Sequence, residues 1–203
     1  MIMNELCFQS PATIVLSGAS FSGKSLFLKR LIENKLFSKP VDKIYYCYGT
    51  WSDDYDSMTD IEFIEGIPTD CTFMFGQGHN LVCFDDLQDK INQNVVNIFT
   101  KDSHHRNLSC VLVLQNLFLD SKLCRTIALN SHYTVLFRNP RAASQYRILA
   151  SQTGHKHLIA AFEDVMKRDK FGYLLIDSSP HGHPDYRLRT RIFPGEDCII
   201  YQG

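Results

Sequence analysis

The sequence predicts an α/β fold in which a mostly parallel sheet is covered by helices on both faces. Apolar, strand-like runs alternate along the chain with amphipathic stretches, and a glycine-rich loop follows the first run directly. Most of the runs are continuously apolar, as strands buried on both faces are. The 203 residues suit a single domain, for which we expect a core over about residues 10–194 and a short C-terminal tail.

Composition and charge exclude several classes of protein. Hydrophobic residues make up 44% of the chain, which argues against disorder, and no apolar run approaches the roughly 18 residues of a membrane helix. Residues 1–10 lack the features of a signal peptide, so we expect an intracellular protein of the cytosol or nucleus with no membrane span. The seven cysteines form no C-x-x-C pair, which predicts buried reduced thiols. A formal net charge of −1 argues against a wholly electrostatic DNA binder.

The elements follow in chain order. Strands are expected at residues 13–17, 43–48, 81–85, 110–115, 133–137 and 172–176. Helical patterns fall between them, at residues 26–36, 91–99, 123–129, 142–150 and 158–166. Residues 49–77 are less regular and carry an acidic patch of Asp53, Asp54, Asp56 and Asp60. We expect a loop-rich connection or small helical insert there, with the aspartates as a solvated surface.

The loop after the first strand matches the Walker A pattern G-x-x-x-x-G-K-[ST] in full. Its residues are Gly18, Ala19, Ser20, Phe21, Ser22, Gly23, Lys24 and Ser25. Glycines let the backbone wrap around a phosphate, and the helix that follows directs its positive N-terminus at the anion. Lys24 is expected to reach the β- and γ-phosphates, and Ser25 to ligate Mg²⁺. The loop therefore predicts a site for ATP and Mg²⁺; the alternative is a glycine-rich turn with a surface lysine.

The third strand ends in two carboxylates, as the Walker B pattern does. Asp85 and Asp86 follow an apolar run about 60 residues after Lys24. We expect this strand beside the phosphate-loop strand, so that Asp85 reaches Mg²⁺ through water. The Asp86 side chain is expected to point in a different direction from that of Asp85, and it can polarise the attacking water. The alternative for Asp86 is a cap on the next turn.

The fourth strand ends in two amides, Gln115 and Asn116. A glutamine at such a strand end, neighbouring the Walker B strand, can contact the γ-phosphate or its water and report the nucleotide state. This is the sensor position of the additional-strand class of P-loop ATPases. The alternative for Gln115 is an amide that caps the following helix.

Two stretches around this strand closely resemble the genome-packaging ATPases of the FtsK–HerA superfamily, above all those of Polinton/Maverick elements, adintoviruses and virophages. They are HHRNLS at residues 104–109 and QNLF at residues 115–118. Further matching stretches are NSHY at 130–133, FRNPR at 137–141, GYLLID at 172–177 and RLRTRIFP at 187–194. The resemblance covers about residues 10–194, and HHRNLS and QNLF together are much more specific than the Walker patterns.

The resemblance implies a RecA-like core and a homo-oligomeric ring, a pentamer or hexamer, that hydrolyses ATP to move double-stranded DNA into a viral capsid. It also implies a capsid protein or portal vertex as partner, and association with the virion. In such rings ATP lies between subunits and a neighbour supplies an arginine finger. Arg125 is the first choice for the finger, with Arg106 and Arg141 as alternatives. The Asp85–Asp86 pair departs from the Asp-Glu of much of the superfamily, which concerns the rate of hydrolysis rather than nucleotide binding.

Three basic clusters are candidates for contacts to DNA phosphates, with plain solvated surface as the alternative for each. They are Arg138, Arg141 and Arg147; Lys167, Arg168 and Lys170; and Arg187, Arg189 and Arg191, which would share one face of a strand. Two other functions stay open for the whole chain. Phosphate transfer to a nucleoside monophosphate would indicate a nucleotide-type small-molecule kinase, and ATP binding without turnover would indicate a non-catalytic assembly factor.

Overall fold

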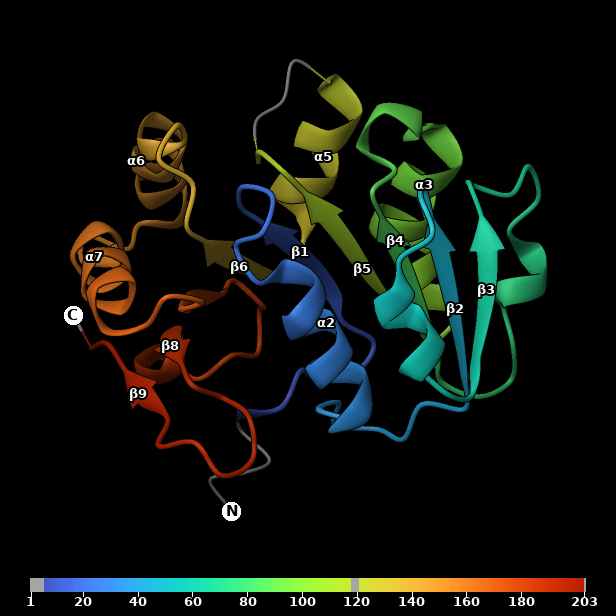
Figure 1. Cartoon of the computed structure of the whole chain (residues 1–203), viewed down its shortest axis with the longest axis horizontal. Helices are drawn as coiled ribbons and strands as arrows, with labels where there is room; N and C mark the ends of the chain where they lie inside the picture. The colour runs from blue at the N-terminus through green and yellow to red at the C-terminus, as the bar shows by residue number, and fades with distance from the viewer. Residues whose placement is uncertain (1–5, 118–120, 203) are drawn as a thin grey trace.

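The computed structural model describes residues 6–117 and 121–202 (Figure 1). Residues 1–5, 118–120 and 203, which include Phe118 of the QNLF stretch, lie outside the described residues. The strands are β1 (Thr13–Ser17), β2 (Lys43–Tyr48), β3 (Ile61–Glu65), β4 (Asn80–Asp85), β5 (Leu108–Leu114), β6 (Tyr133–Phe137), β7 (Tyr173–Asp177), β8 (Leu188–Thr190) and β9 (Ile199–Ile200). The helices are α2 (Lys24–Glu33), α3 (Gln93–Asn97), α4 (Ser103–His105), α5 (Lys122–Asn130), α6 (Ala143–Thr153) and α7 (Leu158–Arg168). Shorter helical segments are η1 (Asp53–Ser57), η2 (Thr72–Met74), η3 (Gln88–Lys90), η4 (Ile98–Asp102) and η5 (Pro184–Tyr186).

One mixed, mostly parallel sheet organises the described part of the chain. Its nine strands follow the order β3-β2-β4-β5-β1-β6-β7-β8-β9. Neighbours from β3 to β6 are parallel, whereas β7, β8 and β9 join antiparallel. The strand that ends in Asp85 is therefore not beside the phosphate-loop strand, because β5 lies between β4 and β1. This inserted strand is the one predicted to carry the sensor amide.

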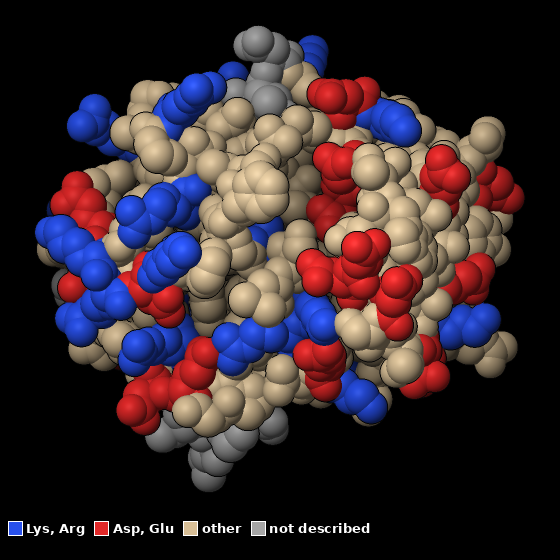
Figure 2. Space-filling model, in the orientation of Figure 1, with Lys and Arg blue, Asp and Glu red and all other residues tan. Residues whose placement is uncertain are grey.

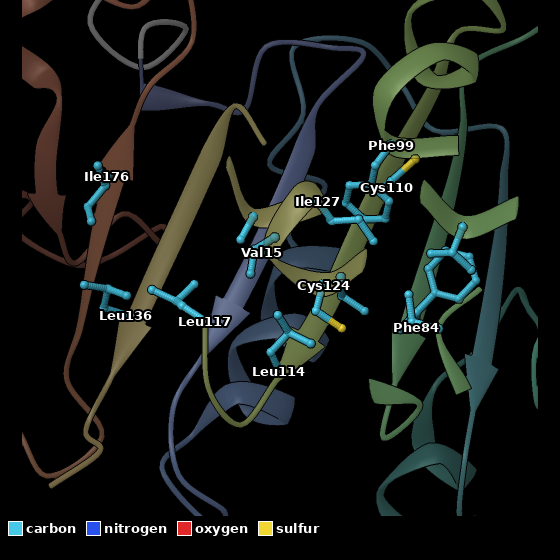
Figure 3. Packing of buried hydrophobic residues seen from close by; sticks show 14 of the residues in the cluster. Val15, Phe84, Phe99, Cys110, Leu114, Leu117, Cys124, Ile127, Leu136 and Ile176 are labelled. Carbon is cyan, nitrogen blue, oxygen red and sulfur yellow. The ribbon is translucent and has the colours of Figure 1, made fainter. Parts of the chain in front are cut away.

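Both faces of the sheet are covered, which explains why its central strands read as continuously apolar. In β1, Val15 packs on one face, whereas Ile14 and Leu16 pack on the other. The first face is covered by α3, α5, α6 and α7, and Figure 3 shows part of that core around Val15. The second face is covered by α2, which crosses the middle of the sheet in Figure 1. Within the described ranges, no helix is long and apolar enough to cross a bilayer.

Two parts of the sheet differ from the sequence prediction. Residues 49–77 contain β3 in addition to the helical turns η1 and η2. β3 is an edge strand whose residues are only partly buried, so it lacks the continuous apolar run that marks the central strands. The expected tail after residue 194 contains β9, which pairs with β8 and extends the sheet.

The prediction that Arg189 belongs to an exposed basic face of β8 is wrong. Its side chain is 1% exposed, and its Nη1 donates to the Asp177 carboxylate at 3.2 Å. Ser179 donates two further hydrogen bonds to the other oxygen of Asp177. Arg187 donates to the Asp177 and Ser179 carbonyls, so this pair of arginines ties β7 to β8. A buried arginine of this kind cannot contact DNA.

Candidate active site

The predicted motifs meet at one cavity of about 930 Å³. It lies at the carboxyl ends of the parallel strands β4 and β5 and beside the loop after β1, the edge where open α/β sheets hold ligands. Its lining includes residues of the phosphate loop, of the two strand ends and of two connections: Phe21, Gly23, Lys24, Ser25, Trp51, Tyr55, Asp85, Asp86, Gln115 and Phe171. Three motifs that lie far apart in the sequence are thus neighbours in space.

The phosphate loop is supported by the end of β6. The Ala19 amide donates to the Arg138 carbonyl at 3.1 Å. Gly18 packs so closely on β6 that a Cβ there would lie 2.5 Å from Cβ of Phe137. Gly23 has a φ of 105°, which suits glycine, and it is the N-cap of α2. Both glycines of the motif are therefore required by the backbone path.

Lys24 lies inside this loop and is 9% exposed. Its Nζ donates to the carbonyl oxygens of Gly18 and Ala19, each at 2.7 Å. Burial lowers the pKa of Lys24, and the nearby carboxyl groups of Asp85 and Asp86 oppose that shift. The ammonium group is therefore placed between the loop backbone and the acidic strand end.

Asp85 ends β4 and is 5% exposed. Two tyrosine hydroxyls donate to its Oδ2, from Tyr46 at 2.7 Å and from Tyr55 at 3.3 Å. Burial raises the pKa of Asp85, and the two tyrosine hydrogen bonds act in the opposite direction. Sequence reasoning identified Asp85 but not the tyrosines, because nothing in their spacing marks a contact with a residue 30 or more positions away.

Asp86 has an exposed side chain and a positive φ of 54°. The carbonyl oxygen of Asp86 lies 2.0 Å from where a Cβ on Gly49 would be, and Gly49 N–H donates to the Asp85 carbonyl at 3.0 Å. The end of β2 therefore fixes the backbone of this carboxylate pair. The following turn η3 has Leu87 as its N-cap with no side-chain cap hydrogen bond, so Asp86 does not cap it.

Gln115 is exposed and lines the cavity directly after β5. Its backbone joins a cluster of amides: its N–H donates to Oε1 of Gln88, and its carbonyl accepts from Nδ2 of Asn139. Asn139 also donates to Oδ1 of Asn116. The helix that follows is capped instead by Ser121, whose side chain accepts from the Cys124 N–H. The side chain of Gln115 is thus not a helix cap.

One wall of the cavity is aromatic, and sequence reasoning missed it. Trp51, which is 47% exposed, contacts the rings of Tyr48, Tyr55 and Phe63, with centroids 5.2 to 5.5 Å apart. Trp51 lies in the irregular connection between β2 and η1, and no sequence motif in that connection marks it as a site residue. It is the only tryptophan of the chain.

The three finger candidates occupy different places. Arg125 lies in the first turn of α5 and Arg141 follows β6, so both are at the carboxyl edge of the parallel strands. Arg106 precedes β5, at the opposite edge, with its guanidinium carbon 5.6 Å from the centroid of the Phe75 ring. None of the three lines the nucleotide-sized cavity among the described residues.

Opposite charges gather on the two sides of this face (Figure 2). We call the exposed side chains Arg138, Lys167, Arg168 and Lys170, at β6 and α7, the basic rim. Arg138 donates to the Met166 carbonyl, so this one member of the first predicted basic cluster lies beside the second cluster at the end of α7. The exposed Asp53, Asp54, Asp56 and Asp60, around η1, form the acidic edge. Arg168 is the one member of the rim with a salt bridge among the described residues, to Asp164 at 2.6 Å.

Strand order, loop and cavity together define a RecA-like P-loop NTPase fold with an additional strand between the two Walker strands. Solved structures of this kind superpose on nearly the whole chain. B204, the DNA-packaging ATPase of Sulfolobus turreted icosahedral virus, matches with a TM-score of 0.56 and 12% identity, over 95% of this chain and 98% of its own. The genome packaging NTPase B204 of Sulfolobus turreted icosahedral virus 2, in complex with AMPPCP, matches with a TM-score of 0.51 and 14% identity, over 95% and 97%.

At this identity the likeness shows the fold. The sulfate complex of the second protein agrees, with a TM-score of 0.54 and 13% identity over 95% of this chain. No protein-family model matches the chain, and no curated protein matches it.

Proposed function

We propose that this protein is an ATP-driven motor that moves double-stranded DNA into a viral capsid. The observation that carries the proposal is the convergence of Lys24, the Asp85–Asp86 pair and Gln115 on one cavity. The fold that holds this cavity is the fold of a viral DNA-packaging ATPase over nearly its full length.

The loop residues suit the phosphates of ATP. The N-terminus of α2 and the loop amides supply donors, and Lys24 can exchange its two backbone carbonyl partners for phosphate oxygens. Ser22 offers a further donor, because its buried hydroxyl has no hydrogen-bond partner among the described residues. These unmet or exchangeable donors are what an anion in the loop would satisfy.

The oxygen donors nearby fit Mg²⁺. The Ser25 hydroxyl and the Asp85 carboxylate both line the cavity, and Mg²⁺ prefers such hard oxygen ligands with waters completing its shell. When bound, the ion would neutralise charge on the phosphate oxygens. Asp85 would then be ionised, its charge balanced by the metal ion and its Oδ2 stabilised by hydrogen bonds from the two tyrosine hydroxyls.

Asp86 and Gln115 are placed to act on water. We assign Asp86 to polarise the water that attacks the γ-phosphorus, and Gln115 to orient that water or the γ-phosphate. The water oxygen bonds to the γ-phosphorus while the bond from the γ-phosphorus to the bridging oxygen breaks. The products are ADP and inorganic phosphate, the water's proton leaves with the phosphate or to solvent, and Lys24 is placed to neutralise charge on ADP. Aspartate is one methylene shorter than the glutamate that is common at this position. The position of the Asp86 carboxylate therefore depends strongly on the position of its own backbone.

Assembly of copies would complete the site. We assign Arg125 as the finger that a neighbouring subunit supplies to the transferred phosphoryl group in a pentameric or hexameric ring. The acidic edge and the basic rim lie on opposite sides of the cavity face, so head-to-tail contacts between copies can pair them (Figure 2).

DNA contacts should be to phosphates, since a packaging motor must move any sequence. The exposed Arg141 and Arg147 of the α6 region and the basic rim supply such charges, repeated around the ring. A capsid protein or portal vertex would anchor the ring, and the virion or the infected cell would be its place of action.

The test is the Mg²⁺-dependent ATPase activity of the purified protein across protein concentration, with and without long double-stranded DNA. Activity that rises faster than linearly with protein and is stimulated by DNA supports a ring with a finger in trans. Activity that is proportional to protein concentration and unchanged by DNA contradicts the proposal of a packaging motor. Phosphate transfer to a nucleoside monophosphate would instead indicate a kinase.

A further inference from the structure

Two tyrosines hold the carboxylate at the end of β4. Tyr46 and Tyr55 both donate to Oδ2 of Asp85, at 2.7 and 3.3 Å. Among residues 6–117 and 121–202, no hydrogen bond reaches Oδ1. We propose that Tyr46 and Tyr55 are positioning residues that reserve Oδ1 of Asp85 for Mg²⁺. The inference rests on the proposed function, because it takes Asp85 as the carboxylate on the magnesium side.

The two hydroxyls come from different elements, so the contact joins three parts of the fold. Tyr46 lies in β2, which pairs with β4. Tyr55 lies in η1, within the irregular connection after β2. Their ring centroids are 5.0 Å apart, and both side chains are buried. Each hydroxyl therefore reaches Asp85 from a ring that packing already holds in place.

The arrangement has a physical reason. A carboxylate that is 5% exposed needs hydrogen-bond partners for its charge, and two donors on one oxygen fix the rotation of the group. Outer partners of this kind orient a metal ligand, and their loss typically weakens metal affinity by about 10- to 100-fold. Loss of either hydroxyl would leave Asp85 freer to turn, and neither tyrosine belongs to the phosphate loop of residues 18–25.

The chain supplies a matched control in Tyr45, the neighbour of Tyr46 in β2. Tyr45 is also buried, and its hydroxyl donates to the Phe73 carbonyl at 3.1 Å. Its side chain packs on the opposite face of the sheet from Tyr46. Tyr45→Phe therefore removes one buried tyrosine hydrogen bond without touching Asp85.

The experiment is a Mg²⁺ titration of the full chain with a non-hydrolysable ATP analogue. Trp51, the only tryptophan, lines the cavity, so its fluorescence can follow binding. The midpoint of the Mg²⁺ titration should rise about tenfold or more in Tyr46→Phe and in Tyr55→Phe, and stay unchanged in Tyr45→Phe. Binding of the analogue in EDTA, measured for each of the four proteins, is the reference for that protein's Mg²⁺ midpoint. Thermal unfolding checks that each variant folds, and if Tyr46→Phe does not, Tyr55→Phe carries the test.

The outcomes separate this inference from the proposed function. Equal midpoints in the three tyrosine variants and the wild type would overturn the positioning role while leaving the proposed function intact. Analogue binding in the wild type that is indifferent to Mg²⁺ would also overturn it, because Asp85 would have no metal to meet. Absence of any analogue binding in the wild type would overturn the proposed function and this inference together.

Discussion

Gly49→Ala should slow ATP hydrolysis, although Gly49 belongs to neither Walker motif. A Cβ on Gly49 would lie 2.0 Å from the Asp86 carbonyl oxygen and 3.0 Å from its carbonyl carbon. Ordinary contact begins near 3.4 Å, so the two backbones must separate by more than 1 Å. A misplacement of about 1 Å at a reacting group can cost about 100-fold in rate. We therefore expect turnover about 100-fold below wild type.

Nucleotide binding is the internal control for this variant. The three atoms nearest to the new methyl group all belong to Asp86 and none to the phosphate loop, so the affinity for ATP in EDTA should equal that of wild type. Gly66→Ala is the matched control in the same connection. Gly66 has a φ of 76° and nothing within 4 Å of an added Cβ, so alanine there costs about 1–2 kcal/mol of strain without moving Asp86.

The assay compares steady-state turnover, analogue affinity and thermal unfolding for both variants. Folded Gly49→Ala with weak turnover and normal binding would support the role of Asp86. If turnover of folded Gly49→Ala equals that of Gly66→Ala, the position of Asp86 does not limit hydrolysis and its assigned role is wrong.

Three further predictions concern other parts of the chain. Lys24→Ala should abolish turnover, and normal turnover in that variant would overturn the site assignment. Arg125→Ala should lower turnover about 1,000-fold or more without loss of ATP binding, and mixing it with Lys24→Ala should restore part of the activity, whereas Arg106→Ala should have little effect. Burial and the neighbouring His104 lower the pKa of His132 from 6.5, and its Nδ1 accepts a hydrogen bond from the Thr13 N–H. The unfolded chain therefore binds more protons, so the free energy of unfolding should fall as the pH drops below about 6.5, and urea titrations of His132→Gln should show a smaller fall.

Much of the fold could be predicted because central strands and helices have strong local patterns. β1, β2 and β6 begin and end at the predicted residues, since β1 and β6 are buried along their whole length and β2 is buried at its centre. The edge strands could not be predicted in the same way. β3 is only partly buried and β9 has two residues, so neither has a continuous apolar run.

That the loop and the strand-end residues would lie together could be predicted, because their motifs have fixed spacing and parallel strands end at the same edge of a sheet. Their supports could not, since those are contacts between distant residues. Tyr46 donates a hydrogen bond to Asp85, 39 positions later in the sequence, and Gly49 after β2 packs against the Asp86 backbone after β4. The prediction for Arg189 was wrong for a related reason. The alternation of arginines along β8 does not reveal that the Arg189 side chain is buried in a salt bridge with Asp177 on β7.

The proposed motor moves along duplex DNA when it hydrolyses ATP at this site. The most direct measurement is displacement of a fluorescent third strand from the major groove of a long duplex, with Mg²⁺ and ATP. We expect the wild type to displace the third strand only when it can hydrolyse ATP, and we expect no displacement by Asp86→Asn, which should still bind ATP. ATP hydrolysis by the assembled wild type with the third strand left in place would contradict the proposed function.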